Sequence, residues 1–370
     1  MKGGVARAAS RIASFLAQGG FQVYVCVFPE SHMAIPHATE PDSSHITTRW
    51  TPLPSADNEL VDLLERASAM AEVIRQLDAD VHFDLFHGIF LPAAFPCLQV
   101  ARRGRRPVIA SARGSDATLW PSNSGSRSII ASVLRHAHTV TAPSRDSLNR
   151  LQAIEDIRDK SAIVPNSAAE PTAPWTLEAA HRHVVGTVAE FYPVKRIPLL
   201  IESYAMVPQV LRKQLLLVGD FPGKGDWQRA MDAIARLGVA HEVSVTGYVD
   251  ASEVARHLRS MRVFVLTSEF EGFSNALLEA ASMGVPVVST QVGGVEELLA
   301  AAPEIPALLV ADEAGLATAI ARVLSSDDLA ASLSAAARQA AHHFRPERER
   351  EKWLEVHQEA LKGAPATLSR

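Results

Sequence analysis

The chain has 370 residues, of which 47% are hydrophobic and 21% charged, and its formal net charge is -5 at pH 7. Its length suggests two domains, and this composition is ordinary for a soluble α/β protein. The small acidic excess argues against a nucleic-acid partner, and no apolar run reaches the roughly eighteen residues of a membrane-spanning helix. The two cysteines have no metal-ligand spacing and indicate buried thiols, so we expect a cytoplasmic protein.

The first half of the chain alternates between helical and strand patterns. Apolar residues at helical spacing predict a helix from Val5 to Leu16, which the glycines at 19 and 20 end. We predict strands at 21–28, 45–48, 83–87, 107–111, 139–144 and 162–166, and helices at 60–77, 93–101, 124–137 and 145–154. This alternation predicts a parallel sheet covered by helices.

No strand precedes the first helix, which follows directly on Gly3 and Gly4. A doubly wound domain normally places its first strand at the centre of the sheet, so we expect a gap there. Our hypothesis is that the functional protein begins about ten or more residues upstream of Met1, which would supply that strand.

Two features of this half have two interpretations each. His87 ends a predicted strand, where it belongs either to a site or to the core. Four arginines between Arg102 and Arg106 follow a predicted helix, whose C-terminus they complement. They form either a solvated corner or a peripheral contact with anionic lipid at the inner face of the membrane.

The second half repeats the pattern of strands and helices. The segment 168–180 contains turn formers and predicts the linker between domains. We predict strands at 183–188, 215–220 and 243–249, and helices at 226–237, 253–260, 296–302, 314–325, 329–343 and 346–361. The predicted domains are therefore 1–172 and 181–345, followed by a C-terminal helical segment at 346–370.

The most informative stretch runs from Val263 to position 289. An apolar strand at 263–266 leads into a polar loop, and a helix then begins after Ser274 and ends at Gly284, before the next strand. In such a βαβ unit, ligands bind at the carboxyl ends of the strands, where a helix N-terminus attracts anions. Glu271 and Glu279 flank this terminus. Amides for a phosphate and carboxylates for hydroxyls suit a sugar nucleotide.

The Glu271-x7-Glu279 pair, followed by Gly284-Val-Pro-Val-Val and by Gly293-Gly294, resembles the donor-site signature of family 4 retaining glycosyltransferases. The resemblance covers nearly the whole chain. It implies the GT-B fold, which has two Rossmann-like parallel-sheet domains with a cleft between them and a C-terminal helix that crosses back to the first domain. The first domain would bind the acceptor and the second the donor.

The resemblance also implies a reaction. A hexosyl group would pass from a nucleotide-diphosphate sugar to a hydroxyl of a glycan, a lipid-linked sugar or a small metabolite, with retention. Glu271 would hold the sugar and stabilise positive charge, Lys195 would carry diphosphate charge with the helix N-terminus, and Glu279 would bind the ribose. We expect neither a metal nor a cofactor beyond the donor. The other candidate donor-binding residues are Gly4, Arg113, Asp116, Gly219, Tyr248, Val249, Gly272, Phe273, Ser274 and Asn275.

Two positions depart from the family pattern. Arg113 occupies the place of a histidine in the His-Gly-x-Asp loop, and Glu190 stands where an arginine is expected, five residues before Lys195. Because a carboxylate repels a diphosphate, either Glu190 turns outward or another cation, Arg196 or Arg113, replaces the arginine. Together with the absent first strand, these departures support one alternative, a non-catalytic or degenerate sugar-nucleotide-binding protein. A second alternative, a sugar-nucleotide epimerase, is open because it shares the architecture.

Overall fold

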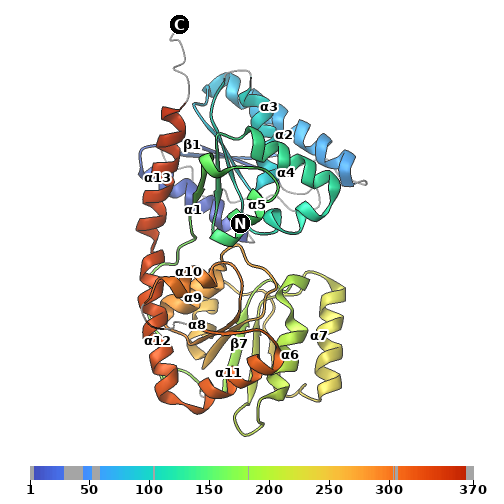
Figure 1. Cartoon of the computed structure of the whole chain (residues 1–370), viewed down its shortest axis with the longest axis vertical. Coiled ribbons are helices and arrows are strands. Elements are labelled where there is room, and N and C mark those ends of the chain that lie inside the picture. Colours follow the sequence, from blue (N-terminus) through green and yellow to red (C-terminus); the bar gives the residue numbers. More distant parts are fainter. Residues whose placement is uncertain are drawn as a thin grey trace. The chain divides into compact units, whose positions relative to one another are not determined.

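The computed structural model describes residues 4–28, 45–51, 59–102, 105–181, 183–302, 304 and 307–363. The chain forms two compact units (Figure 1). The first unit consists of Met1–Pro165 and Glu349–Arg370, and the second of Asn166–Arg348. The segment 168–180, which we expected to be the linker, lies within the second unit.

The first unit contains parallel strands in two groups. Strands β1 (Val23–Val27) and β2 (Ile46–Trp50) pair with each other, and a separate sheet has the order β3 (Phe86–Ile89), β4 (Val108–Ser111), β5 (Thr139–Ala142) and β6 (Ser161–Ile163). No strand within the described ranges joins β1 to β3. We expected a break of this kind where the sequence offers no central strand. Where the natural chain begins stays a hypothesis.

The helices of the first unit are α1 (Gly4–Gln18), α2 (Glu59–Val81), α3 (Leu91–Ala101), α4 (Ser124–His136), α5 (Arg145–Gln152) and most of α13 (Pro346–Lys362). Helices α2, α3 and α4 pack against one another. Helix α13 lies beside α1 (Figure 1), where the fully buried Trp353 joins Ile12 and Phe15 in one apolar cluster. The prediction that the C-terminal helix returns to the first domain is therefore confirmed.

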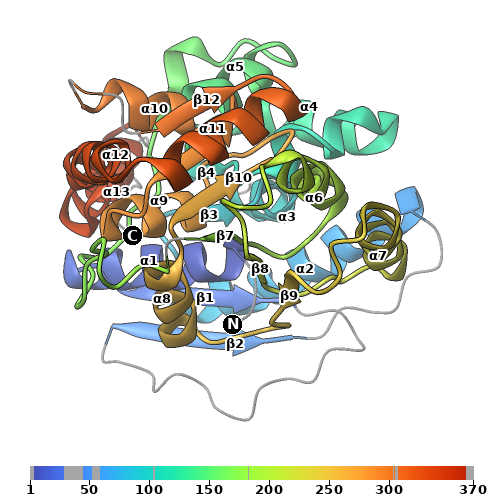
Figure 2. The same ribbon diagram turned by 90° about the horizontal axis from the view of Figure 1, so that it is seen from below.

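The second unit is a single parallel sheet with the strand order β12-β11-β10-β7-β8-β9 (Figure 2). Its strands are β7 (Val184–Val188), β8 (Gln214–Val218), β9 (Val243–Val245), β10 (Val263–Leu266), β11 (Val287–Thr290) and β12 (Ala307–Val310). The chain builds outward from β7 through β8 to β9 and then returns to β10, which pairs with β7 on its other side. The order of the strands thus reverses between β7 and β10, which is the position where doubly wound sheets bind ligands.

Helices cover both faces of this sheet. They are α6 (Ile197–Met206), α7 (Lys224–Leu237), α8 (Ala251–Ser260), α9 (Asn275–Met283), α10 (Val295–Ala300), α11 (Glu313–Ser325) and α12 (Asp327–Ala341). Helix α6 packs with α7 and α11, whereas α9 packs with α8 and α12. With both faces covered, the strands become near-continuous apolar runs such as Leu215–Val218, all of them buried. The two parallel-sheet, Rossmann-like domains that we predicted are present.

Two elements of the second unit, α6 and β12, were not predicted. In the described part of the chain, no helix has both the length and the apolar character needed to span a bilayer.

Candidate functional site

The loops that follow β7 and β10 lie at the carboxyl ends of two neighbouring strands, at the point where the strand order reverses. The first loop, 189–196, contains a short 3-10 turn at Pro193–Lys195. The second, 267–274, connects β10 to α9. The sheet topology therefore brings together two segments that are more than seventy residues apart in the chain.

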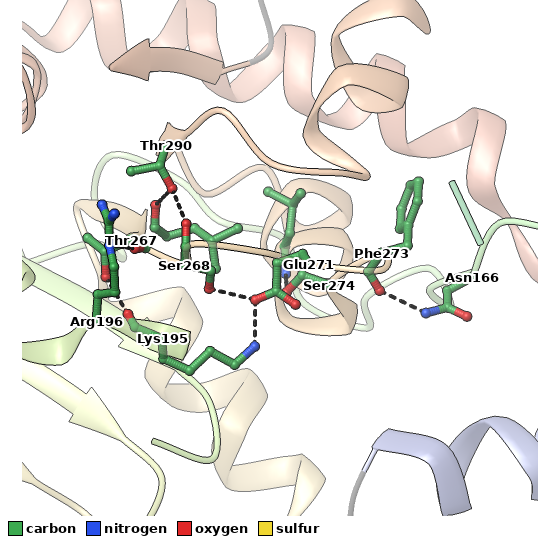
Figure 3. Close-up of polar contacts among 11 residues, drawn as sticks. Asn166, Lys195, Arg196, Thr267, Ser268, Glu271, Phe273, Ser274 and Thr290 are labelled. Carbon is green, nitrogen blue, oxygen red and sulfur yellow. Dashed lines mark hydrogen bonds and ion pairs between the residues drawn. The ribbon is translucent and has the colours of Figure 1, made fainter. Parts of the chain in front are cut away.

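Lys195 and Glu271 form an ion pair between these two loops (Figure 3). The Lys195 ammonium lies 2.5 Å from Oε1 of Glu271, and the two side chains are 20% and 10% exposed. The Ser268 hydroxyl donates to the same oxygen at 2.6 Å. Two of the predicted catalytic groups, distant in sequence, are thus adjacent in a largely buried polar cluster.

Three further hydrogen bonds fasten the loops to each other. The Thr267 hydroxyl donates to the Lys195 carbonyl at 2.8 Å, and Arg196 Nε donates to the Thr267 carbonyl at 3.0 Å. The Glu269 amide donates to the Val194 carbonyl at 2.9 Å. Figure 3 shows the first two of these bonds beside the ion pair. These bonds fix the backbone of Lys195 relative to the loop that carries Glu271.

Helix α9 begins at Asn275, four residues after Glu271. Ser274 is its N-cap and accepts a hydrogen bond from the Leu277 amide at 3.3 Å, as the sequence predicts. The N–H groups of Asn275 and Ala276 have no partner among the described residues. Oδ1 of Asn275 is also buried without a hydrogen bond there. Unpaired amides at a helix N-terminus carry partial positive charge and suit an anion.

Glycines shape the backbone around this helix end. Gly219, directly after β8, has φ +139°, and a Cβ there would overlap the carbonyl oxygen of Ala189. Gly294 has φ +85°, and a Cβ there would come within 3.0 Å of Phe273. Both positions therefore require glycine, and they allow the loops after β8 and β11 to approach the loops that carry Lys195 and Glu271.

The remaining candidates of the second unit lie at or near the carboxyl ends of its strands. Gly272 and Phe273 are buried between Glu271 and the start of α9, and Glu279 is half-buried on α9 itself. Tyr248 and Val249 follow β9, where the Tyr248 ring is 64% exposed. Their contacts with a donor remain predictions, because the geometry establishes only where they lie.

The candidates of the first unit have different surroundings. Gly4 is exposed at the start of α1. Asp116 is fully buried, and its carboxylate accepts hydrogen bonds from the amides of Leu91, Arg113 and Gly114 at 2.8–2.9 Å. Burial raises the pKa of Asp116, although these three amides oppose the shift. Its carboxylate holds the loop after β4 in shape.

The guanidinium of Arg113 lies over the Trp353 ring of α13, at 5.1 Å from its centroid. Burial lowers the pKa of Arg113 to about 10, while the carboxylate of Glu349 opposes the shift. Glu349 also accepts hydrogen bonds from Arg11 at 2.8 Å and from the Trp353 indole at 3.2 Å. Arg113 thus belongs to a buried polar cluster that ties the loop after β4 to α13.

His87 lies in the same cluster. Its Nε2 is 2.6 Å from the Ser111 hydroxyl, which in turn is 2.6 Å from the Thr141 hydroxyl, and its ring centroid is 5.0 Å from that of His357. Burial lowers the pKa of His87 well below its usual value, and lowers the pKa of His357 to about 4. His87 is half-buried and its Nδ1 has no hydrogen bond among the described residues, so both of its interpretations stay open.

The side chain of Glu190 is exposed, and both alternatives for this unusual residue stay open. Arg196 donates through Nε to the Thr267 carbonyl and has a left-handed backbone, with φ 49°. Lys195 is accordingly the cation of this loop that contacts Glu271.

Comparison with known proteins accounts for this arrangement. Residues 2–168 match the profile of a family described as "Glycosyltransferase Family 4", and residues 182–326 match "Glycosyl transferases group 1". The chain is a family 4 glycosyltransferase. As a member of this family, it is a retaining hexosyltransferase that uses a nucleotide sugar. The role of the Glu271-x7-Glu279 motif in this chain stays a prediction.

Individual relatives are distant. The chain is 25% identical to N-acetyl-alpha-D-glucosaminyl L-malate synthase from Bacillus anthracis over 302 residues, covering 77% of this chain and 76% of that protein. Sucrose-phosphate synthase from Thermosynechococcus elongatus superposes with a TM-score of 0.83 at 20% identity, covering 97% and 94% of the two chains. HepE from Anabaena, solved with UDP-glucose, gives a TM-score of 0.77 at 18% identity, covering 97% of each chain. These structural neighbours confirm the GT-B fold.

Sequence reasoning missed several groups that build the site of this glycosyltransferase. Ser268 and Thr267 follow β10 directly, and polar residues just after a buried strand were the available signal. Asn166, the first residue of the second unit, donates through Nδ2 to the Phe273 carbonyl at 2.8 Å (Figure 3). The sequence predicts it only as the end of a strand at 162–166. Thr290, at the end of β11, donates to the Ser268 carbonyl at 2.7 Å.

The described residues contain no cluster of three or more histidines, cysteines, aspartates or glutamates that could hold a metal. Asp78 and Asp80 have an Asp-x-Asp spacing, but they lie in α2, where Asp78 pairs with Arg106. Arg102 and Arg105 are exposed and line a shallow pocket with Arg106. Membrane contact there remains a prediction.

Proposed function

We propose that the second unit binds a nucleotide-diphosphate sugar, and that the enzyme transfers its hexosyl group to an acceptor hydroxyl with retention at the anomeric carbon. One observation carries this proposal, the ion pair of Lys195 and Glu271 beside the open amides of α9, at the point where the strand order reverses. A cation and a helix N-terminus suit a diphosphate, and a carboxylate suits sugar hydroxyls.

The leaving group of this reaction is a nucleoside diphosphate, whose charge increases as the bond to the sugar breaks. Lys195 and the amides of Asn275 and Ala276 are positioned by the fold before the donor arrives. Preorganised donors of this kind stabilise developing negative charge without reorganisation, and removing one typically costs about 100- to 1000-fold in turnover. We assign the leaving-group role to these three groups.

The two glutamates have separate roles in the proposal. Glu271 accepts hydrogen bonds from the transferred sugar, and its negative charge stabilises the positive charge that develops at the anomeric carbon. Glu279, which lies a little over one helical turn after the start of α9, binds the ribose hydroxyls. No side chain is assigned as a covalent nucleophile.

The acceptor is proposed only by chemical class. A hydroxyl of a glycan, a lipid-linked sugar or a small metabolite would bind to the first unit, and the exposed Arg102 and Arg105 would contact the inner face of a membrane if the acceptor is lipid-linked. The relative from Bacillus anthracis is named for N-acetylglucosaminyl transfer, and HepE was solved with UDP-glucose. UDP-sugars are therefore the first donors to test.

The test is a donor panel of UDP-, GDP- and ADP-hexoses, followed by proton NMR of the anomeric signal in the first product formed. We expect at least one α-linked donor to be cleaved, slowly by water and faster with a suitable acceptor, and the new product to be α-configured. A β-configured first product, or no cleavage of any donor in the panel, would refute the proposal.

A further inference from the structure

The carboxylate of Glu271 is held through only one of its two oxygens. Lys195 Nζ and Ser268 Oγ both donate to Oε1, at 2.5 and 2.6 Å. No described residue donates to Oε2. In Figure 3 the two dashed lines meet on one oxygen, and the other points away from both donors. The carboxylate thus keeps one oxygen available to a ligand.

Ser268 is itself fixed in place. The residue is 1% exposed and lies two positions after the end of β10. Its carbonyl accepts a hydrogen bond from the Thr290 hydroxyl at 2.7 Å, and the same hydroxyl lies 3.4 Å from the Leu266 carbonyl. Two neighbouring strands, β10 and β11, therefore determine where the Ser268 hydroxyl lies.

The two donors to Glu271 differ in what happens to them when substrate binds. The Lys195 ammonium is a cation that a diphosphate would attract, which weakens its bond to Glu271. The Ser268 hydroxyl is neutral and sits on a short side chain, so a diphosphate does not attract it away from Glu271. A hydroxyl bonded to a carboxylate at this distance is among the stronger protein hydrogen bonds.

We propose that Ser268 is a positioning residue that holds the Glu271 carboxylate by Oε1, so that Oε2 accepts a hydrogen bond from a hydroxyl of the transferred sugar. This inference rests on the proposed function and adds a specific residue to it. Ser268 acts through Glu271 and does not contact the nucleotide. Its loss should affect the sugar part of the donor and leave the nucleoside diphosphate part unaffected.

The experiment compares Ser268→Ala with Ser289→Ala. The Ser289 hydroxyl is equally buried and donates to the Thr290 carbonyl at 2.7 Å, but it does not contact Glu271. UDP, UDP-glucose and UDP-N-acetylglucosamine are titrated into each protein, and turnover of both UDP-sugars is measured. Ser268→Cys is included because its size is close to serine and its thiol is a weak donor, so it keeps the test valid if the alanine variant folds poorly.

For Ser268→Ala and Ser268→Cys we expect roughly a 10- to 100-fold loss of kcat, since a hydrogen bond to a charged group is lost, with UDP affinity within about twofold of wild type. Ser289→Ala should keep wild-type kcat. Wild-type kcat in both Ser268 variants, or a loss of UDP affinity as large as the loss of kcat, would overturn the positioning role alone. A wild-type protein that turns over no donor would overturn the proposed function as well.

Discussion

The ion pair between Lys195 and Glu271 makes a quantitative prediction about the stability of the second unit. Fully exposed pairs contribute about 0.2–1 kcal/mol, whereas removing one partner of a fully buried pair costs about 3–5 kcal/mol. This pair is 20% and 10% exposed on its two sides, so it lies between those limits. We expect Lys195→Met and Glu271→Gln each to lower the free energy of unfolding by about 2 kcal/mol, with a coupling of about 1–2 kcal/mol.

The assay is a double-mutant cycle, with urea unfolding of the wild type, both single variants and the double variant. Hydrogen exchange in β7 and β10 would confirm that the second unit is the part that unfolds. The matched control is Arg236→Met with Glu202→Gln, an ion pair of the same unit whose arginine side chain is 62% exposed. That cycle should give a coupling of less than about 0.5 kcal/mol. Equal couplings in the two cycles would refute the claim that burial makes the Lys195–Glu271 contact the stronger of the two.

Two further predictions concern stability. In urea unfolding, Gly219→Ala should destabilise the second unit by more than about 2 kcal/mol, because the new Cβ would overlap the Ala189 carbonyl at a strained φ. Gly238→Ala has open space at its Cβ and should cost about 1 kcal/mol. Similar losses of stability at both sites would contradict this prediction. The second prediction concerns pH. Burial lowers the pKa of His357 in the folded state from 6.5 to about 4, so the unfolded state binds more protons on acidification. The free energy of unfolding of the first unit should therefore fall between pH 6.5 and 4, by up to about 3 kcal/mol. Hydrogen exchange in α13 should show this loss of stability. His357→Leu should reduce the slope of stability against pH, and the same change at the exposed His136 should leave that slope unchanged. A slope in His357→Leu equal to that of the wild type would count against the shifted pKa.

Local chemistry was the part of this protein that the sequence predicted well. Helix α9 begins after Ser274 and ends at Gly284, which has φ 83°, because a side-chain cap and a left-handed glycine act within one turn of the helix. Helix α6 was missed because Pro198 and an almost continuous apolar run conceal its helical periodicity. Strand β12 was missed although it is as long as β10, because its short apolar run follows the prolines at 303 and 306, which favour a loop.

The construction of the site could not be predicted from the same signals. Lys195 meets Glu271 only because β10 pairs with β7, and that pairing is a property of the whole sheet rather than of either loop. The hydrogen bond of Asn166 to the Phe273 carbonyl likewise depends on tertiary placement. The bond of Ser268 to Glu271 joins residues three apart in one loop, and it depends on a loop conformation that no sequence pattern predicted. The strand-loop-helix pattern placed Glu271 before α9 and Glu279 within it, as the structure has them, but it gave no indication of the serine that donates to Glu271.

The roles of the two glutamates can be separated by kinetics. Glu279→Ala removes hydrogen bonds to the ribose, so it should mainly raise KM for the donor, whereas Glu271→Ala should also lower kcat. Glu253→Ala, which changes a glutamate of α8 in the same unit whose side chain is 46% exposed, provides the matched control.

The most direct test of the donor site is calorimetric titration of UDP-glucose and UDP-N-acetylglucosamine into the wild type, Glu279→Ala and Glu253→Ala. We predict saturable binding of at least one donor, an affinity about 10-fold or more weaker in Glu279→Ala, and an unchanged affinity in Glu253→Ala. Donor binding to Glu279→Ala that equals binding to the wild type would contradict the placement of the donor at the N-terminus of α9.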